Sequence, residues 1–307
     1  MQGKGPMRLE DVIAASGLQA RYVEEWLKGM ASAGYLDYDP QARCYALSEE
    51  HAYFLASEGT DHFAGGMFEM VPVLLRVAPQ VAEAFAKGGG VAFEEFGPQC
   101  VGALDLINRG QYEHRFTSYW LQALPEAVAK LQAGGRMLDV GCGSGRVCAA
   151  FAQAFPSADI TGIDPDPESI RRAKALGARA AFKVATAGAL LGERFDLITL
   201  CDCVHDLAEP AKTLREVHAL LEPDGHLFIV EPKAADRLED NHNPVATMFY
   251  GFSIFHCMTQ SLARGGPGLG TCMGPAAAER LVREAGFTRF EVLPVKSQVN
   301  LFYAARP

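Results

Sequence analysis

Short apolar runs alternate with longer amphipathic segments between residues 136 and 231. The runs have the length of buried strands, and the segments between them have helical periodicity. Strands are predicted near 137–140, 159–163, 180–184, 195–200 and 226–231, and helices at 167–176 and 209–221. This alternation predicts an α/β fold with a mainly parallel sheet covered by helices on both faces. Ligands of such sheets bind at the carboxyl ends of the strands, where we expect the site.

The flanking segments are mostly helical in pattern. Residues 8–33 predict two short helices around a turn, and residues 35–47 predict a small hairpin, which together make a winged helix. After residue 275, a helix capped by Gly286 and two closing antiparallel strands are expected. The expected organisation is a winged-helix-like domain at 1–60, a helical linker and cover at 61–132, and an α/β domain at 133–307 with a helical insertion at 236–275.

A glycine-rich turn follows the first strand of the α/β domain. Glycines at 141, 143 and 145 let the backbone approach a ligand, and the helix that follows offers unpaired amides to a carboxylate or phosphate. The dinucleotide fingerprint would need a further glycine where Arg146 stands. Asp139, two residues before the first glycine, suits a ligand ammonium group better than a pyrophosphate. An amino-acid zwitterion satisfies both charges.

A second acid, Asp164, ends the next predicted strand. An acid at this position can accept both ribose hydroxyls of an adenosine. The two acids together therefore predict a nucleoside that carries an amino acid.

These segments resemble class I S-adenosylmethionine (SAM) dependent methyltransferases. The resemblance rests on LeuAspValGlyCysGlySerGly at 138–145, on Asp164, on the strand and edge at 195–207 and on the strand at 221–231. It covers roughly residues 118–307 and implies a Rossmann-like, seven-stranded domain with SAM as its cofactor. The alternative is a Rossmann-like domain that binds no SAM.

The resemblance also implies which residues contact the cofactor. They are Asp139, Gly141, Cys142, Gly143, Asp164, Pro165, Thr186, Ala187, Cys201 and Asp202. Many relatives have an acid after the third strand, against the adenine amino group. This chain reads ValAlaThrAla at 184–187, and Thr186 is left to accept that hydrogen bond.

His205 is the candidate general base. It follows the fourth strand, and an imidazole pKa of about 6.5 suits a base near neutral pH. In plant-type O-methyltransferases a His-Asp pair and a later glutamate occupy these places, which His205, Asp206 and Glu231 match; the tryptophan that often follows the pair is replaced by Leu207. The resemblance implies methyl transfer to a hydroxyl oxygen of a small molecule. Transfer to sulfur or nitrogen, which needs no such base, is the alternative.

Two aromatic-rich segments are candidate walls of the acceptor pocket. The first contains Tyr112 and Trp120, and the second is a predicted helix over 244–258 with Met248 and Phe252 on one face and His256 nearby. Packing between helices, on the sheet or on a second subunit explains both patterns equally well.

The charge of the winged-helix segment changes the expectation for its role. Residues 1–60 carry five Lys and Arg against nine Asp and Glu, a balance that repels phosphate. Small-molecule O-methyltransferases of the plant type use a similar module for dimerisation, so we expect a homodimer and no nucleic-acid partner. The opening helix of that module has no counterpart here, which suggests a truncated N-terminus. The alternatives are a winged-helix regulator controlled by SAM and a SAM binder without activity.

Composition fits a globular enzyme. The 307 residues are 49% hydrophobic with a net charge of −9, which argues against general affinity for nucleic acid or anionic lipid. No signal peptide or membrane span is recognisable, and the eight cysteines form no CxxC pair, so we expect a cytoplasmic protein with reduced thiols. Cys201, Cys203 and His205 could hold a soft metal or metalloid, but small residues at a strand end explain the cysteines, and no metal is expected.

Overall fold

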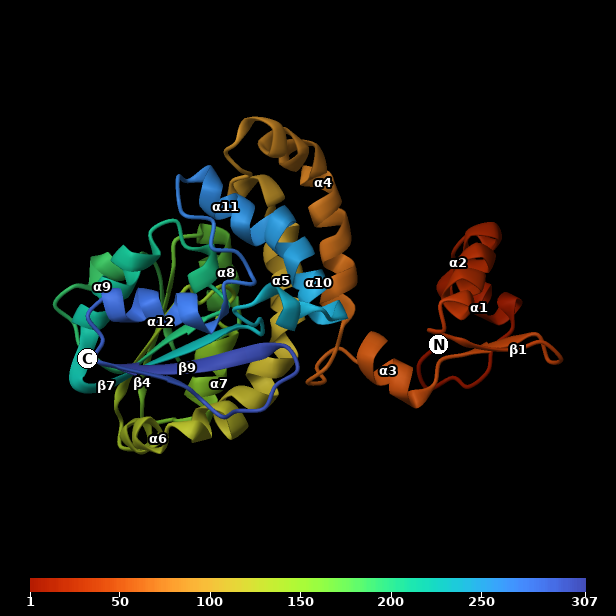
Figure 1. The fold of residues 1–307 in the computed structure, drawn as a ribbon. Helices are drawn as coiled ribbons and strands as arrows, with labels where there is room; N and C mark the ends of the chain where they lie inside the picture. Colours follow the sequence, from red (N-terminus) through yellow and green to blue (C-terminus); the bar gives the residue numbers. More distant parts are fainter.

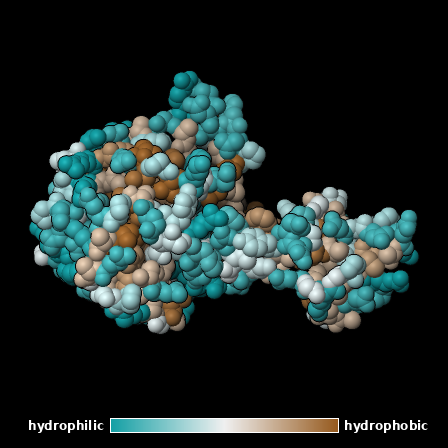
Figure 2. Space-filling model, turned by 90° about the horizontal axis from the view of Figure 1, so that it is seen from below, coloured by the Kyte–Doolittle hydropathy of each residue, from teal (hydrophilic) through white to brown (hydrophobic).

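The computed structural model describes residues 1–307 as two lobes of unequal size. The small lobe contains α1 (Leu9–Ser16), α2 (Ala20–Ser32), β1 (Asp37–Asp39) and β2 (Cys44–Ala46), which are the predicted two helices and hairpin. Its own core is built around Val23 and the fully buried Leu27. Helix α3 (Glu49–Leu55) bridges to the large lobe, and a narrow waist separates the two (Figures 1 and 2).

The large lobe is built on a seven-stranded sheet with the order β5-β4-β3-β6-β7-β9-β8. Strands β3 to β7 are parallel, and β9 pairs antiparallel with both β7 and β8. The strands are β3 (Arg136–Val140), β4 (Asp159–Asp164), β5 (Ala181–Val184), β6 (Phe195–Cys201), β7 (Leu221–Pro232), β8 (Arg289–Val292) and β9 (Asn300–Arg306). The predicted parallel strands and antiparallel closing strands are all present.

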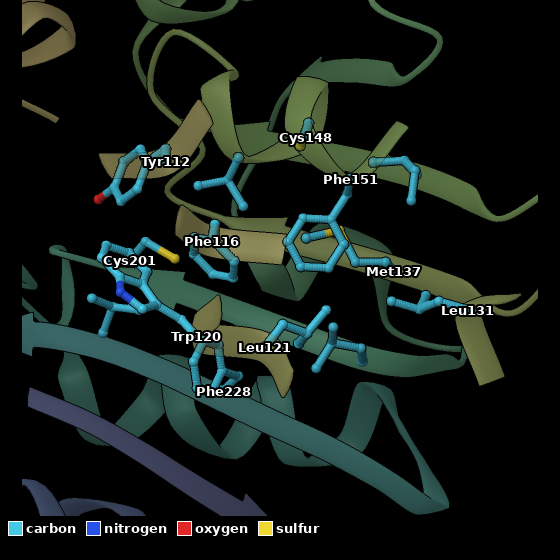
Figure 3. Close-up of a cluster of buried hydrophobic side chains, with 14 of the residues drawn as sticks. Tyr112, Phe116, Trp120, Leu121, Leu131, Met137, Cys148, Phe151, Cys201 and Phe228 are labelled. Atoms are coloured by element: carbon cyan, nitrogen blue, oxygen red, sulfur yellow. The ribbon is translucent and has the colours of Figure 1, made fainter. Parts of the chain in front are cut away.

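Helices cover both faces of the sheet, as the alternating pattern predicts. One face is covered by α6 (Pro125–Gln132), α7 (Arg146–Ala154), α8 (Pro167–Ala175), η3 (Leu121–Ala123) and the π-helical segment η2 (Tyr112–Trp120). The other face is covered by η4 (Ala187–Leu190), α9 (Pro210–Leu220) and α12 (Gly274–Glu284). Phe116 packs between Phe151 of α7 and Phe228 of β7, with ring centroids 5.2 and 5.5 Å away (Figure 3).

A helical cover packs beside the carboxyl edge of the sheet (Figure 1). It is formed by α4 (Gly65–Lys87), η1 (Phe93–Phe96), α5 (Pro98–Gln111), α10 (Pro244–Phe252), η7 (Ser253–Cys257) and α11 (Met258–Ala263), while η6 (Leu238–Asn241) precedes α10. The helix predicted over 244–258 therefore extends to Ala263 and changes to π-helical geometry at η7. No helix has the combination of length and apolar character that crossing a membrane would require.

Candidate active site

The glycine turn between β3 and α7 forms one end of the candidate site. Gly141, Gly143 and Gly145 all have positive φ, a conformation in which a Cβ atom is strained. A Cβ on Gly145 would lie 2.8 Å from the Phe182 ring, so this glycine lets α7 pack on the sheet. A Cβ on Gly143 would meet nothing within 4 Å, which leaves the bare backbone of that residue facing open space.

Asp164, at the end of β4, is hydrogen-bonded to this turn. Its Oδ2 accepts the backbone N–H of Gly143 at 3.0 Å, and its Oδ1 accepts that of Asp166 at 2.8 Å. Burial raises the pKa of Asp164, and the two N–H donors partly offset that rise. Each carboxylate oxygen keeps a second lone pair, so the side chain can accept further hydrogen bonds from a ligand.

Asp139 is buried at the end of β3, before the glycine turn. The side chain is 1% exposed, its Oδ1 accepts the Thr199 hydroxyl at 2.6 Å, and burial raises its pKa to about 7. Contact between Asp139 and a ligand ammonium group stays a prediction. Residue 139 points to the face of β3 that α7 covers, and Cys148 of α7 lies 3.9 Å from its Oδ2.

Asp202, directly after β6, has a strained backbone. Its φ of 51° is one of two positive values among the non-glycine residues. Tyr112 donates its hydroxyl to Oδ2 of Asp202 at 2.5 Å, and Asn300 of β9 donates to Oδ1 at 3.3 Å. Burial raises the pKa of Asp202 to about 7, and the hydrogen bond from Tyr112 offsets part of that rise. Asp202 is therefore held at the strand edge by side chains of η2 and β9.

The other predicted cofactor residues differ in accessibility. Cys142, Ala187 and Cys201 are buried, whereas Pro165 and Thr186 are exposed. The Thr186 hydroxyl is therefore accessible to a ligand at the carboxyl end of β5. The sequence predicts this hydroxyl as the hydrogen-bond partner of the adenine amino group.

His205 lies in η5 (Val204–Asp206), immediately beyond β6, and pairs with Glu231 of β7. Nδ1 of His205 donates to Oε2 of Glu231, while the N–H of Val204 donates to Oε1 at 2.9 Å. Both side chains are almost completely buried. Because a carboxylate only accepts, the proton of the neutral imidazole is on Nδ1, and Nε2 keeps its lone pair.

Two carboxylates control the charge of this imidazole. Burial alone lowers the pKa of His205, but Glu231 and Asp206 together raise it more, and the pKa lies well above its usual range. Oδ1 of Asp206 is 3.2 Å from Nε2 of His205. His205, Asp206 and Glu231, which the sequence grouped by resemblance, are thus one contiguous cluster.

The predicted walls of the acceptor pocket are only partly supported. Trp120 is 1% exposed and its ring packs 4.8 Å from the Phe302 ring inside the core, which favours the alternative of packing between helices. His256 is equally buried, with Nε2 3.4 Å from Sγ of Cys100, and belongs to the packing of the helical cover. Phe252 packs against the buried residues of α4 and α5. Tyr112 and Met248 stay as candidates, the first held by Asp202 and the second half-buried.

Three further groups were not identified from the sequence. Arg146 binds Asp105 of α5 through two hydrogen bonds of 2.8 Å, which fixes the cover to the start of α7. Asn300 contacts Asp202, and Cys257 of η7 lies beside His205 and Asp206. The sequence could have marked Arg146, because it stands where the dinucleotide fingerprint has its third glycine. Nothing in the sequence marks Asn300 or Cys257.

Cys201 and Cys203, which the sequence suggested as ligands of a soft metal, do not form a metal-ligand cluster with His205. Cys203 donates its thiol to the Val140 carbonyl at 3.4 Å, and Cys201 is buried at the strand end. Cys257, from the insertion, takes the place beside His205. All eight cysteines are free thiols, as expected.

Comparison with known families identifies both lobes. Residues 112–291 match a family described as a methyltransferase domain, and residues 1–57 match an Rv2258c-like winged HTH domain. A relative from Pseudomonas aeruginosa named ubiquinone biosynthesis O-methyltransferase is 30% identical over 178 residues, which are 56% of this chain and 69% of the relative. Trans-aconitate 2-methyltransferase of Methylobacterium radiotolerans is 32% identical over 172 residues, which are 55% of this chain and 60% of that protein.

Solved structures share the whole architecture. Human N-acetylserotonin methyltransferase, in complex with SAM, superposes with a TM-score of 0.73 over 99% of this chain and 88% of its own, at 19% identity. This likeness shows that the fold is shared over both lobes and the helical cover. The methyltransferase-domain match covers more than half of the chain. The chain therefore belongs to the methyltransferase-domain family, and it carries a winged helix in front of that domain.

Proposed function

We propose that this protein transfers the methyl group of SAM to a hydroxyl oxygen of a small molecule, with His205 as general base. The observation that carries the proposal is the buried His205–Glu231 pair at the ends of β6 and β7. Glu231 holds the imidazole in the tautomer whose Nε2 can accept a proton. The name of the Pseudomonas aeruginosa relative supports oxygen as the acceptor atom.

The residues at the carboxyl edge fit SAM. The open backbone face of Gly143 admits a ligand, and Asp164 beside it has lone pairs for two ribose hydroxyls. Asp202, held by Tyr112 and Asn300, is suited to an ammonium group. SAM would supply an electrophilic methyl group there. The complex of human N-acetylserotonin methyltransferase with SAM supports this cofactor.

The chain's own contribution to the chemistry is a positioned base. A hydroxyl is a weak nucleophile until its proton is removed, and Nε2 of neutral His205 can take that proton. Glu231 and Asp206 then stabilise the imidazolium that forms, because both carboxylates adjoin the ring. The helical cover closes this edge of the sheet and would exclude water from the acceptor.

We also propose that the protein is a homodimer formed through its small lobe and α4. Each of these side chains is at least half exposed: Leu18 in the turn before α2, Tyr22 and Trp26 on α2, and Phe68, Val71 and Leu75 on α4. Apolar side chains gathered in this way on exposed helices mark an interaction surface. A second copy offers the same apolar surface. Light scattering should show a dimer that dissociates in a Tyr22→Ser, Trp26→Ser variant; a monomeric wild type would refute the dimer.

The reaction is tested by measuring S-adenosylhomocysteine release with a panel of phenols, aliphatic alcohols, thiols, amines and carboxylic acids. Turnover with a hydroxyl acceptor, and a methyl ether identified by mass spectrometry, is the expected result. Turnover confined to thiols or amines would refute the hydroxyl assignment. SAM binding without turnover on any acceptor class would favour a regulator, which gel-shift assays with genomic DNA fragments would then reveal.

A further inference from the structure

A cluster of three different metal-ligand types lies where η5 meets the helical cover. His205, Asp206 and Cys257 each direct one ligand atom into the cluster, and the three atoms lie within 4.8 Å of one another. Nε2 of His205 and Oδ1 of Asp206 are 3.2 Å apart. His205 and Cys257 are buried, and Asp206 is partly exposed.

We propose that these three residues form a binding site for a divalent ion of the zinc class, and that the bound ion inhibits methyl transfer. The inhibition rests on the proposed role of His205 as base, whereas the ion binding does not. The ion would be a regulator rather than a cofactor, so the expectation that catalysis needs no metal is unchanged.

The donor set suits zinc. Imidazole nitrogen, carboxylate oxygen and thiolate sulfur are its usual ligands, and tetrahedral bonds of about 2.0–2.3 Å place ligand atoms roughly 3.3–3.8 Å apart. The separations in the cluster, all within 4.8 Å, need to shrink by at most about 1.5 Å to reach this geometry. Zinc coordination would release the thiol proton of Cys257 to solvent, and the resulting thiolate and the Asp206 carboxylate together balance the charge of the divalent cation. The fourth position stays open for water or for a substrate oxygen.

The surroundings of His205 are those of a metal ligand. Metal-binding histidines generally donate their other ring N–H to a carboxylate, which fixes the ring and leaves one lone pair for the ion. Nδ1 of His205 donates to Glu231 in this way, so Nε2 is the free nitrogen and faces the cluster.

One buried polar atom beside the cluster lacks a hydrogen-bond partner. It is Oγ1 of Thr271, whereas Oδ1 of Asp206 has Nε2 of His205 3.2 Å away as its partner. Thr271 is 4% exposed and adjoins the Cys257 thiol. An ion would take the place of the His205 imidazole proton between Nε2 and the Asp206 oxygen, and water in the fourth position would satisfy the Thr271 hydroxyl.

Binding of the ion and base catalysis exclude each other. The imidazole has one lone pair on Nε2, and an ion that coordinates it leaves none to accept a proton. The ion would also tie Cys257 of the insertion to η5 at the strand edge, and so hold the cover against the sheet. Zinc should therefore lower kcat, with Cys257 required for the effect.

Metal binding to the intact two-lobed chain tests the site directly, without a methyl acceptor. Zn²⁺ is titrated by calorimetry, and Co²⁺ is added to detect the thiolate-to-cobalt charge-transfer band that only cysteine ligation produces. Wild type should bind one zinc ion and show the band. Loss of a residue that only hydrogen-bonds to a metal ligand generally lowers metal affinity by about 10–100-fold. Cys257→Ser and Asp206→Asn remove ligands themselves, so each should weaken zinc binding by more than about 100-fold. Cys272→Ser and Cys44→Ser are the matched thiol controls.

Two results would overturn the inference. Absence of the cobalt band in wild type, or a band that survives in Cys257→Ser and disappears in a control variant, would show that this cluster is not the site. Zinc that binds without changing turnover would refute the inhibition. Either result can occur while methyl transfer to a hydroxyl persists, so failure of the ion site is distinguishable from failure of the proposed reaction.

Discussion

The two halves of the site are built in different ways. The cofactor half, which comprises the Gly141–Gly145 turn and Asp164, is made largely of backbone groups and one carboxylate at the ends of adjacent parallel strands. The acceptor half, which comprises His205, Glu231 and Cys257, is made of buried side chains from three separate segments. The first half is fixed by strand geometry, whereas the second depends on how the helical cover packs. Substitutions in the two halves should therefore affect different steps.

The largest effect is expected for His205→Ala. Removal of a positioned general base typically costs about 10²–10⁴-fold in rate, so kcat with a hydroxyl acceptor should fall by that factor. The affinity for SAM, measured by calorimetry, should change little because His205 contributes no contact to the glycine turn. His242→Ala, at an exposed histidine, is the control and should retain wild-type kcat. Turnover that survives in His205→Ala would point to a nucleophile that needs no base.

Asp164→Asn should show the opposite pattern. Hydrogen bonds from ribose hydroxyls to a charged carboxylate contribute roughly 1.5–3 kcal/mol, so SAM affinity should fall by about 10–100-fold. At saturating SAM, kcat should stay near the wild-type value. Unchanged SAM affinity would remove Asp164 from the cofactor half.

A pair of glycine substitutions separates binding from stability within the cofactor half. Gly145→Ala should lower the free energy of unfolding by about 1–3 kcal/mol beyond the backbone strain, because its Cβ would press against Phe182. Gly143→Ala carries the backbone strain alone, about 1–2 kcal/mol, but fills the open ligand face and should weaken SAM binding. Denaturant unfolding and calorimetry measure both quantities. Equal loss of stability in the two variants would contradict this division.

The same difference explains how far the sequence could predict the site. Strand ends and a glycine turn are local features, so the parallel sheet and the place of Asp164 at its edge could be predicted from the sequence. The grouping of His205 with Glu231 came from the family resemblance, because the two residues are far apart in the chain. The burial of Asp139 was not predicted, because alternation along β3 turns its side chain toward α7, which a strand-end position alone does not reveal. Nor does the sequence show that the backbone of Asp202, a predicted cofactor contact, has a positive φ.

The acceptor half could not be predicted from sequence patterns. An aromatic stripe has the same spacing on a pocket wall and in a core, and only packing placed Trp120 in the core. His256 and Cys257 lie in the π-helical segment η7, whose geometry shifts them relative to a regular helix. Contact between Cys257 and His205 requires the insertion to pack on η5, a long-range arrangement with no local signal.

The pH dependence of kcat/KM for wild type and Glu231→Gln tests the assignment of His205 most directly. A general base must be neutral, so the rate should rise with pH through the pKa of His205, which Glu231 and Asp206 hold well above the usual imidazole range. Glutamine keeps a hydrogen-bond acceptor but removes a carboxylate charge, so the rising limb of the Glu231→Gln profile should lie at lower pH. A limb in the same place in both proteins, or a rate independent of pH, would contradict His205 as the base.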